Sequence, residues 1–219
     1  MHLLRSKKTL IIATTLFSLV FSGNCLARES RFAVSAEKSI NKDYAVGANI
    51  DYRFLDQESF FKLYEVSLKK YFKNDLSVQL THRFYYLHRQ SNPDWKLGNM
   101  SHIRVAKTVK TDIIDYGFRV AHEYFFGNIQ GNQHRSRLLL SIRPHKKFHS
   151  FKPFISNEIF YRHKQGRFVR NWLSTGVEYY HGKHARYFIN HIYEYNENPN
   201  DTLFWVHDHG VLAGAAFKF

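Results

Sequence analysis

Hydrophobic and polar residues alternate with a period of two along most of the chain after residue 43. Residues 44–54 place apolar side chains on every second position and small, polar or charged residues between them, and residues 115–126 show the same division. Alternation of this kind is typical of a β-strand with one apolar face. Eight further segments fit it less regularly: 60–72, 76–88, 101–111, 134–144, 151–163, 168–181, 184–196 and about 204–219.

Short and long connections alternate between these segments. Short turns are expected at 73–75, 111–112, 144–150 and 182–184, and longer loops fall in the intervening positions. Short turns at one rim and longer loops at the other are typical of outer-membrane barrels. The sequence therefore predicts an all-β protein: a single antiparallel up-and-down transmembrane β-barrel of about ten strands, formed by residues 44–219.

Residues 31–40 are the segment that does not fit this count. They could form an eleventh strand, but the short turn after residue 40 would then put their start outside the cell, which is the wrong parity for a single-chain bacterial barrel. We therefore expect residues 28–43 to be a pre-strand segment that folds into the lumen or against the periplasmic mouth.

The last nine residues carry the alternation to the end of the chain. One face of this stretch holds Val211, Ala213, Ala215, Phe217 and Phe219. An aromatic final residue preceded by alternating hydrophobic residues looks like the terminal strand that the barrel-assembly machinery recognises. We expect this strand to close the barrel and to serve as that assembly signal. An ordinary strand at a soluble terminus is the alternative.

The first 27 residues read as a cleaved secretory signal peptide. A basic start is followed by an apolar run from Thr9 to Phe21 and a small, polar stretch that ends in Ala27. The run of about 13 residues is shorter than the roughly 20 that a transmembrane helix needs. The single cysteine, Cys25, lies in this segment, so the mature chain is expected to have no disulfide and no thiolate metal site.

Charge and composition narrow the set of partners. The formal net charge is +14, and the three basic residues of the leader leave +11 for the mature chain. For an exported protein, anionic lipopolysaccharide, acidic oligosaccharides or internal ion pairs are better partners than nucleic acid. The 14 Tyr and 20 Phe would supply aromatic girdles at two membrane interfaces. We expect a monomer in the bacterial outer membrane, in contact with lipid and lipopolysaccharide.

The face opposite the apolar one is rich in arginine and would fill the lumen. Arginine has a planar fork of donors that pairs with two carboxylates at once, so these side chains could pack a small barrel. Unpaired arginines lining an anion pore are the alternative. The network is predicted to contain Arg53, Arg83, Arg119, Glu123, Arg135, Arg137, Glu158, Arg170 and Glu178.

The segments 134–144, 151–161 and 167–180 resemble a family of uncharacterised bacterial outer-membrane barrels, a domain-of-unknown-function family. The matching features are an Arg-x-Arg strand, a strand with a lumenal Glu, and an Arg-Asn pair leading into a strand that contains Gly. They correspond here to Arg135 and Arg137, Glu158, Arg170 with Asn171, and Gly176. The resemblance implies a fold and a location and brings no known activity.

Candidate catalytic groups are few. His207, Asp208 and His209 could supply a base with its carboxylate, or two metal ligands. In a strand, however, Asp208 takes the face opposite to the two histidines. The serines at 67, 136, 141 and 174 have no histidine partner in the local sequence. We expect no cofactor and no metal, and we leave enzymatic activity open.

Three functions remain at this stage. The first is a non-enzymatic barrel that serves envelope structure, surface binding or narrow passage. The alternatives are a small anion-preferring channel and a surface hydrolase using His207, Asp208 and His209. A soluble secreted barrel is a further alternative, because Lys62 and Lys70 fall on the apolar face, where a charge costs about 2 to 4 kcal/mol at mid-bilayer.

Cell fractionation tests the membrane assignment. We expect the mature protein in the outer-membrane pellet, with a mobility on denaturing gels that changes on boiling, because closed barrels resist detergent until heated. A soluble periplasmic band without such a shift would contradict the prediction.

Overall fold

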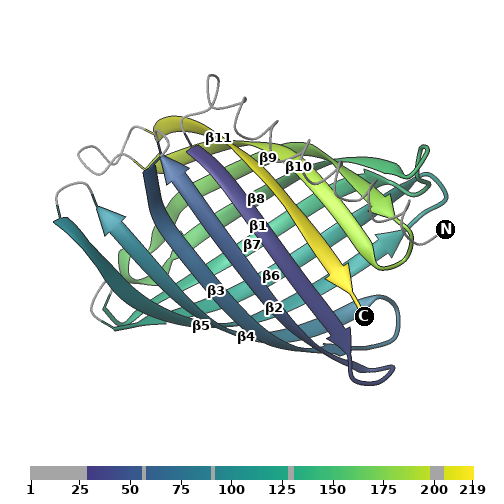
Figure 1. Cartoon of the computed structure of the whole chain (residues 1–219), viewed down its shortest axis with the longest axis horizontal. Coiled ribbons are helices and arrows are strands. Elements are labelled where there is room, and N and C mark those ends of the chain that lie inside the picture. Colours follow the sequence, from purple (N-terminus) through teal and green to yellow (C-terminus); the bar gives the residue numbers. More distant parts are fainter. Residues whose placement is uncertain (1–28, 56–57, 90–91, 128–130, 198–204) are drawn as a thin grey trace, which may run out of the picture.

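Eleven β-strands form a closed barrel in the computed structural model, which describes residues 29–55, 58–89, 92–127, 131–197 and 205–219 (Figure 1). The expected signal peptide, residues 1–27, lies outside the described residues. A three-residue 3₁₀ turn, η2 (His163–Gln165), joins β8 to β9. The strands are β1 (Glu29–Ser39), β2 (Tyr44–Leu55), β3 (Glu58–Tyr71), β4 (Leu76–Arg89), β5 (Asn92–Lys110), β6 (Ile114–Phe126), β7 (Gln133–Pro144), β8 (Phe151–Arg162), β9 (Arg167–His181), β10 (Ala185–Glu197) and β11 (Trp205–Lys218).

The strand count corrects the expectation of ten. Residues 31–40 do not fold into the lumen or the periplasmic mouth, because β1 is a full member of the barrel wall. It pairs antiparallel with β2 and parallel with β11, from Glu29 opposite Gly210 to Glu37 opposite Lys218. Figure 1 shows β1 and β11 running side by side toward the rim where the chain ends. An odd number of strands requires one such parallel pair, and all other neighbours are antiparallel.

Small residues in β11 make room for this closure. A Cβ atom built on Gly214 would lie 2.2 Å from the carbonyl oxygen of Ala33 in β1, so only glycine fits there. A Cβ on Gly210 would likewise lie 2.9 Å from the carbonyl oxygen of Glu29. The run of small residues near the end of the chain therefore has a steric reason, which is the approach of the first strand.

One expected loop is part of a strand. Residues 90–100 were expected to connect two strands, but β5 begins at Asn92 and extends through this stretch. Its first part pairs with the outer part of β4, with Gly98 opposite Tyr85 and Met100 opposite Arg83. The register shifts between Leu87 and Arg89, which accommodates the turn residues at this end of the hairpin.

Alternation along each strand separates two faces. In β4, Tyr85 is buried in the lumen whereas its neighbour Phe84 is 43% exposed on the outer wall. Large apolar side chains are also exposed on the outer wall of other strands, as with Val66 and Val120. No helix within the described residues is long and apolar enough to cross a membrane.

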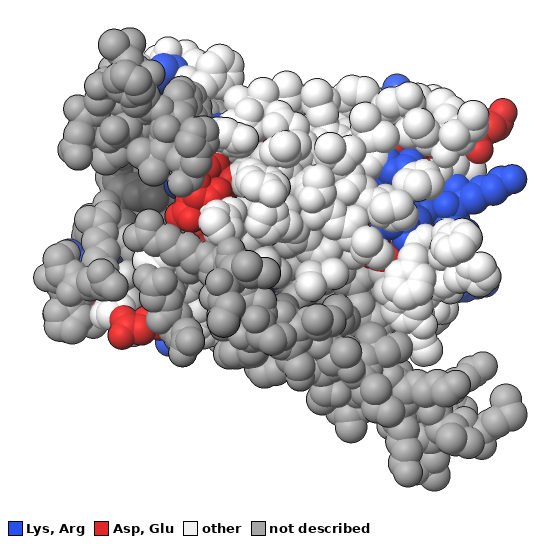
Figure 2. Space-filling model, turned by 90° about the horizontal axis from the view of Figure 1, so that it is seen from above, with Lys and Arg blue, Asp and Glu red and all other residues white. Residues whose placement is uncertain are grey.

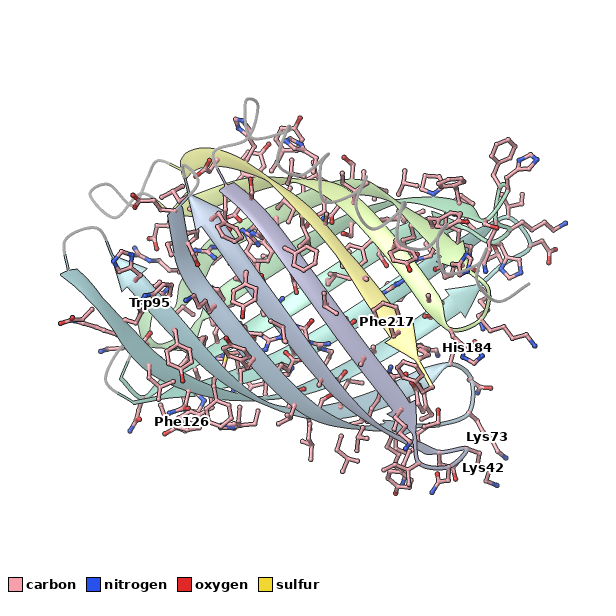
Figure 3. All side chains as sticks on the ribbon, in the orientation of Figure 1. Lys42, Lys73, Trp95, Phe126, His184 and Phe217 are labelled. Atoms are coloured by element: carbon pink, nitrogen blue, oxygen red, sulfur yellow. The ribbon has the colours of Figure 1, made fainter. Side chains whose placement is uncertain are left out.

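The two rims differ in their connections. Lys42 and Lys73 lie at the end where the turns are short, and Trp95 and Phe126 lie toward the opposite end (Figure 3). We call these ends the short-turn rim and the long-loop rim. Because β6 runs toward the long-loop rim and β7 returns from it, residues near Phe126 and Gln133 lie at that end of the wall.

Engineered cysteines test the closure by β1. Val34 and Ala215 are partners on the outer face of the β1–β11 pair, and paired strands lie about 4.8 Å apart, within reach of a disulfide. We expect Val34→Cys with Ala215→Cys to cross-link in the folded mature protein, detected by a mobility shift that a reductant reverses.

Two matched pairs control this experiment. Val34→Cys with Val211→Cys should not cross-link, since Val211 lies opposite Ser30. Ile50→Cys with Ala215→Cys should not cross-link either, because β1 separates these strands. Cross-linking of this last pair would instead indicate a ten-strand barrel closed by β2.

Candidate functional site

The lumen is filled by arginine and carboxylate side chains from nearly every strand. Glu123 of β6 is the most buried of them, with no exposed surface. Its Oε2 accepts from Arg135 Nε at 2.6 Å, and its Oε1 accepts from Arg137 Nη1 at 2.8 Å. Arg83 Nη1 lies 3.8 Å from the same Oε1. One carboxylate on β6 thus holds guanidinium groups from β4 and β7.

Glu158 of β8 extends this cluster. Its Oε1 accepts from Arg137 Nη2 and from Arg119 Nη2, both at 2.7 Å. Arg137 therefore bridges Glu123 and Glu158, as expected for a planar group with five donors. Arg83 also donates to Glu65 of β3. The connected set joins five of the six consecutive strands from β3 to β8, and β5 is the strand that has no member in these contacts.

A second cluster lies where the first and last strands, β1 and β11, close the barrel. Arg31 of β1 donates to Glu29 at 2.5 Å and also pairs with Glu194 of β10. Its guanidinium lies 4.6 Å from the ring centre of Trp172 on β9. Arg53 Nη2 lies 3.4 Å from Asp51 Oδ2 within β2. The strand that the sequence placed outside the wall therefore supplies a central lumenal cation.

A third cluster surrounds Glu178 of β9. Arg186 donates to its Oε1 at 2.8 Å, and the hydroxyl of Tyr180 donates to its Oε2 at 2.5 Å. Arg143 Nη1 lies 3.4 Å from the same Oε2. Five arginines of the predicted network thus have a carboxylate partner: Arg53, Arg83, Arg119, Arg135 and Arg137. Its three glutamates accept hydrogen bonds from these arginines or from further ones: Glu123, Glu158 and Glu178.

Arg170 is the exception in the predicted network. Among the described residues, no carboxylate oxygen lies within 4.0 Å of its guanidinium. It instead lies 5.6 Å from the ring centre of Trp172 and 5.9 Å from that of Phe160. Aromatic faces stabilise such a cation by electrostatic attraction to the ring.

A cavity of about 470 Å³ lies between these clusters. Within the described part of the chain, eight arginines and only three carboxylates line it, the latter being Asp51, Glu158 and Glu178. Two buried donors on its wall, Arg53 Nε and Trp172 Nε1, have no hydrogen-bond partner among the described residues. The cavity therefore presents guanidinium groups and unpaired donors, while four carboxylate partners of these arginines, Glu29, Glu65, Glu123 and Glu194, do not line it. The lining arginines are Arg31, Arg53, Arg83, Arg135, Arg137, Arg162, Arg170 and Arg186.

Sequence reasoning missed several members of this wall. Arg31 was missed because residues 31–40 were excluded from the barrel, and Arg162 because it stands at a strand end. Phe160 and Trp172 were missed because they are aromatic residues on the lumenal face, although the alternation with Glu158 and Arg170 places them there. Strand parity was the signal that could have found them.

The other candidate residues lie elsewhere. Asp208 and His209 take opposite faces of β11, with Asp208 opposite the lumenal Glu194. Asp208 Oδ1 accepts from the backbone N–H of His209 at 2.8 Å. The side chain of His207 lies outside the described residues. Among the residues that are described, no group of three or more His, Cys, Asp or Glu is arranged to hold a metal ion.

The terminal residues of the expected assembly signal lie on or beyond β11. Val211, Ala213, Ala215 and Phe217 alternate with the lumenal positions of that strand, and the backbone of Phe219 exchanges hydrogen bonds with Glu37 and Ser39 of β1. The last residue is thus fixed to the first strand.

Lys62 and Lys70 lie on the outer face, as the alternation indicates. The ammonium of Lys62 is 4.1 Å from the ring centre of Trp95, near the long-loop rim. That of Lys70 is 5.0 Å from the ring centre of Phe72, near the short-turn rim. Each charge therefore sits over an aromatic ring at one end of the wall and away from its middle.

The closed barrel with a charged lumen and an apolar outer wall is the fold of outer-membrane β-barrels and porins. The structure is similar to the NanC porin, with a TM-score of 0.53 and 9% identity over 87% of this chain and 98% of that one. Lower similarity is found to the β domain of the Bordetella autotransporter BrkA (TM-score 0.46, 10% identity, 80% and 82% covered). The anion-selective porin from Comamonas acidovorans gives 0.42, at 12% identity, with 84% of this chain and 54% of that one covered.

The chain belongs to the family described as "Protein of unknown function (DUF2490)", whose model matches residues 32–204. This agrees with the predicted membership in an uncharacterised family of outer-membrane barrels. No curated protein matches the sequence.

Substitution of Glu123 tests the lumenal network. Glu123→Gln keeps the shape but leaves the guanidinium group of Arg135 without its carboxylate partner and that of Arg137 with Glu158 alone. Removal of one partner of a buried ion pair costs about 3 to 5 kcal/mol. We expect a loss of that order in the free energy of unfolding, measured by urea titration of the refolded barrel with tryptophan fluorescence.

Asp75→Asn is the matched control. Asp75 pairs with Lys110 at 2.8 Å at the short-turn rim, where both side chains are about half exposed. Such a pair contributes about 0 to 1 kcal/mol, so the control should unfold close to the wild type. Equal effects of the two substitutions would contradict a structural role for the network.

Proposed function

We propose that the protein is a narrow outer-membrane channel that prefers small anions. The observation that carries this proposal is the cavity wall, which eight arginines and three carboxylates line among the described residues, while four further carboxylates pair with these arginines without lining the cavity. A wall with excess positive charge in a region of low dielectric attracts anions and repels cations. Arg170 adds to this field because no described carboxylate neutralises it at short range.

The outer wall supports insertion into a membrane. Large apolar side chains are exposed on every strand from β2 to β10, and an extended apolar surface of this kind marks a membrane or protein interaction site. Figure 2 shows one face on which acidic and basic side chains lie near the two ends and leave a broad band between them without charge. Strands of 11 to 19 residues tilted by about 40° also suffice to span an apolar band of about 25 Å.

The two outward lysines fit this placement. A charge at the middle of the band would cost about 2 to 4 kcal/mol, but the cost falls to about 0 to 1 kcal/mol near either interface. Lys62 and Lys70 lie toward opposite ends of β3 and rest on aromatic rings. Their position favours a membrane barrel over a soluble barrel that carries an apolar ligand.

The size of the cavity limits the ligand. A volume of about 470 Å³ lies within the range of small-molecule sites. Guanidinium groups bind carboxylates and phosphates with two parallel hydrogen bonds, so carboxylates, phosphates and the similar sulfates of small organic molecules are the suited class. Arg53 Nε and Trp172 Nε1 offer further donors that no described residue uses.

The proposed location in the outer membrane also implies which partners the protein has. Outer-membrane lipid and lipopolysaccharide would surround the wall, and the excess basic charge of the chain suits anionic head groups. The strand ending in Phe217 and Phe219 would be read by the barrel-assembly machinery before its backbone joins β1. A barrel closed within one chain needs no second copy, which favours a monomer.

Reversal potentials in planar bilayers test the anion preference. Under a tenfold KCl gradient, the purified barrel should show stepwise conductance with a reversal potential of the sign for chloride over potassium. Arg170→Gln removes one charge from the cavity wall, and its interaction with an anion in the cavity is on the order of 1 kcal/mol. We expect the chloride preference to fall about fivefold.

Arg170→Lys is the matched control, because it keeps the charge and should keep most of the preference. A cation preference of the wild type, or a folded and inserted barrel without conductance, would refute the channel.

A further inference from the structure

A polar cluster interrupts the apolar outer face near the long-loop rim. It consists of His122 on β6, His134 and Ser136 on β7, and His163 in η2, and we call it the Ser136 cluster. Ser136 pairs with His122 across the β6–β7 ladder, and both side chains take the face opposite to the lumenal Glu123 and Arg135. Figure 3 places Phe126, the last residue of β6, toward the same end of the barrel as Trp95.

The hydroxyl of Ser136 lies between two imidazoles. Its Oγ is 2.9 Å from His163 Nε2 and 3.2 Å from His122 Nδ1. The other ring nitrogen of His122, Nε2, is 3.1 Å from Nδ1 of His134. These contacts join a hydroxyl, an imidazole and a second imidazole in one chain of hydrogen bonds.

This order of groups is that of an activated serine. When His122 carries its proton on Nε2, it donates to His134, and its Nδ1 is free to accept the proton of Ser136. A nucleophile within about 2.6 to 3.2 Å of a base that a third group orients is the signature of covalent acyl transfer. The proton on Nε2 of His163 would then be directed at Oγ and would hold the hydroxyl from its other side.

An apolar groove opens beside the cluster. It is a shallow, largely open depression of about 670 Å³ on the wall of β3 to β6, and it reaches from His122 and Tyr124 to Val66 and Leu68. Leu80 and Ile103 lie along it. A groove of this composition suits an extended acyl chain, and its end at His122 would bring the ester carbonyl of that chain next to Ser136.

The position of the Ser136 cluster along the barrel axis agrees with a membrane-lipid ester as the substrate. The ester bonds of a bilayer lipid lie at the boundary between the acyl chains and the head groups. Ser136 is the fourth residue of β7, which begins at the long-loop rim, and His163 belongs to the connection outside β8. If the long-loop rim faces the outer leaflet, the hydroxyl lies at the level of those esters.

A second serine on the outer face, Ser101, has a histidine neighbour but, among the described residues, no further group that orients that histidine. Ser101 Oγ is 2.9 Å from His82 Nδ1, and both residues line the groove. Among the described residues, no hydrogen bond to Nε2 of His82 orients its ring as His134 orients that of His122. Ser101 is therefore a matched comparison for Ser136.

We propose that Ser136, His122 and His134 form an esterase site on the outer wall that hydrolyses acyl esters of membrane lipids. Oγ of Ser136 attacks the ester carbonyl while His122 Nδ1 takes its proton, and the proton passes to the departing alcohol. Water then attacks the acyl-serine with His122 again as base, which releases the fatty acid and restores the hydroxyl. His134 is a positioning residue. The site rests on the membrane placement proposed above and is independent of conduction through the lumen.

Reconstituted full-length barrel tests the site in two arms. Vesicles of phosphatidylethanolamine supply phospholipid esters, and vesicles of phosphatidylethanolamine with lipopolysaccharide supply its acyl esters as well, with released fatty acids measured by mass spectrometry. A fluorophosphonate probe should label Ser136, identified on its peptide. We expect fatty acid release from at least one of the two vesicle preparations, and the preparation that shows it identifies the lipid substrate.

Substitutions assign the roles. Ser136→Ala should abolish release and labelling, and His122→Ala should lower kcat by about 10²- to 10⁴-fold, the range for a lost general base. His134→Ala should lower kcat with KM unchanged, which a loss of lipid docking would not produce. Ser101→Ala should retain probe labelling of Ser136. Heat-modifiable mobility verifies folding, and bilayer conductance of Ser136→Ala should equal that of the wild type.

Two results would overturn the proposal. One is the absence of both fatty acid release and probe labelling in wild-type protein that is folded and inserted. The other is activity that Ser136→Ala leaves unchanged. Neither result bears on the anion channel, whose test depends on Arg170.

Discussion

Closure of the sheet into a ring is the constraint on which the other features of this protein depend. A ring of strands leaves no edge, so backbone donors and acceptors along the wall are paired without water. Here the ring closes by the parallel pair β1–β11, and Gly214 is needed because any side chain would meet the backbone of Ala33. Once the ring is closed, alternation sends half of the side chains into the lumen and half to the outside.

Ion pairs in the lumen follow from that division. Arginine and glutamate buried together lose hydration, and their mutual attraction offsets this cost only when geometry and hydrogen bonding are good. Glu123 and Glu158 meet this condition through Arg137, which contacts both carboxylates. Arg170 does not, since its described neighbours are aromatic faces. The network thus stiffens one part of the lumen and leaves net positive charge in another, which is why a packed interior and an anion preference are compatible.

The outer wall and the lumen offer separate chemistry on the same strands. On β6 and β7, Glu123 and Arg135 face inward, while their neighbours His122, His134 and Ser136 face outward. A substitution on one face therefore leaves the other chemically intact, although both depend on the same register. A slip of one residue in either strand would exchange the two sets and destroy both.

The sequence by itself determined the all-β barrel, the lumenal character of the arginines and the outward position of Lys62 and Lys70, because alternation with period two is local information. It did not determine the strand count. Whether β1 joins the wall depends on its fit against β11, about 180 residues away in the chain, and turn parity argued against it. Only the tertiary structure decided which arginine pairs with which carboxylate, that no described carboxylate lies within 4.0 Å of Arg170, and that Ser136 meets His122 and His163. Such contacts depend on cross-strand register and on loop geometry, and the spacing of residues along one strand specifies neither.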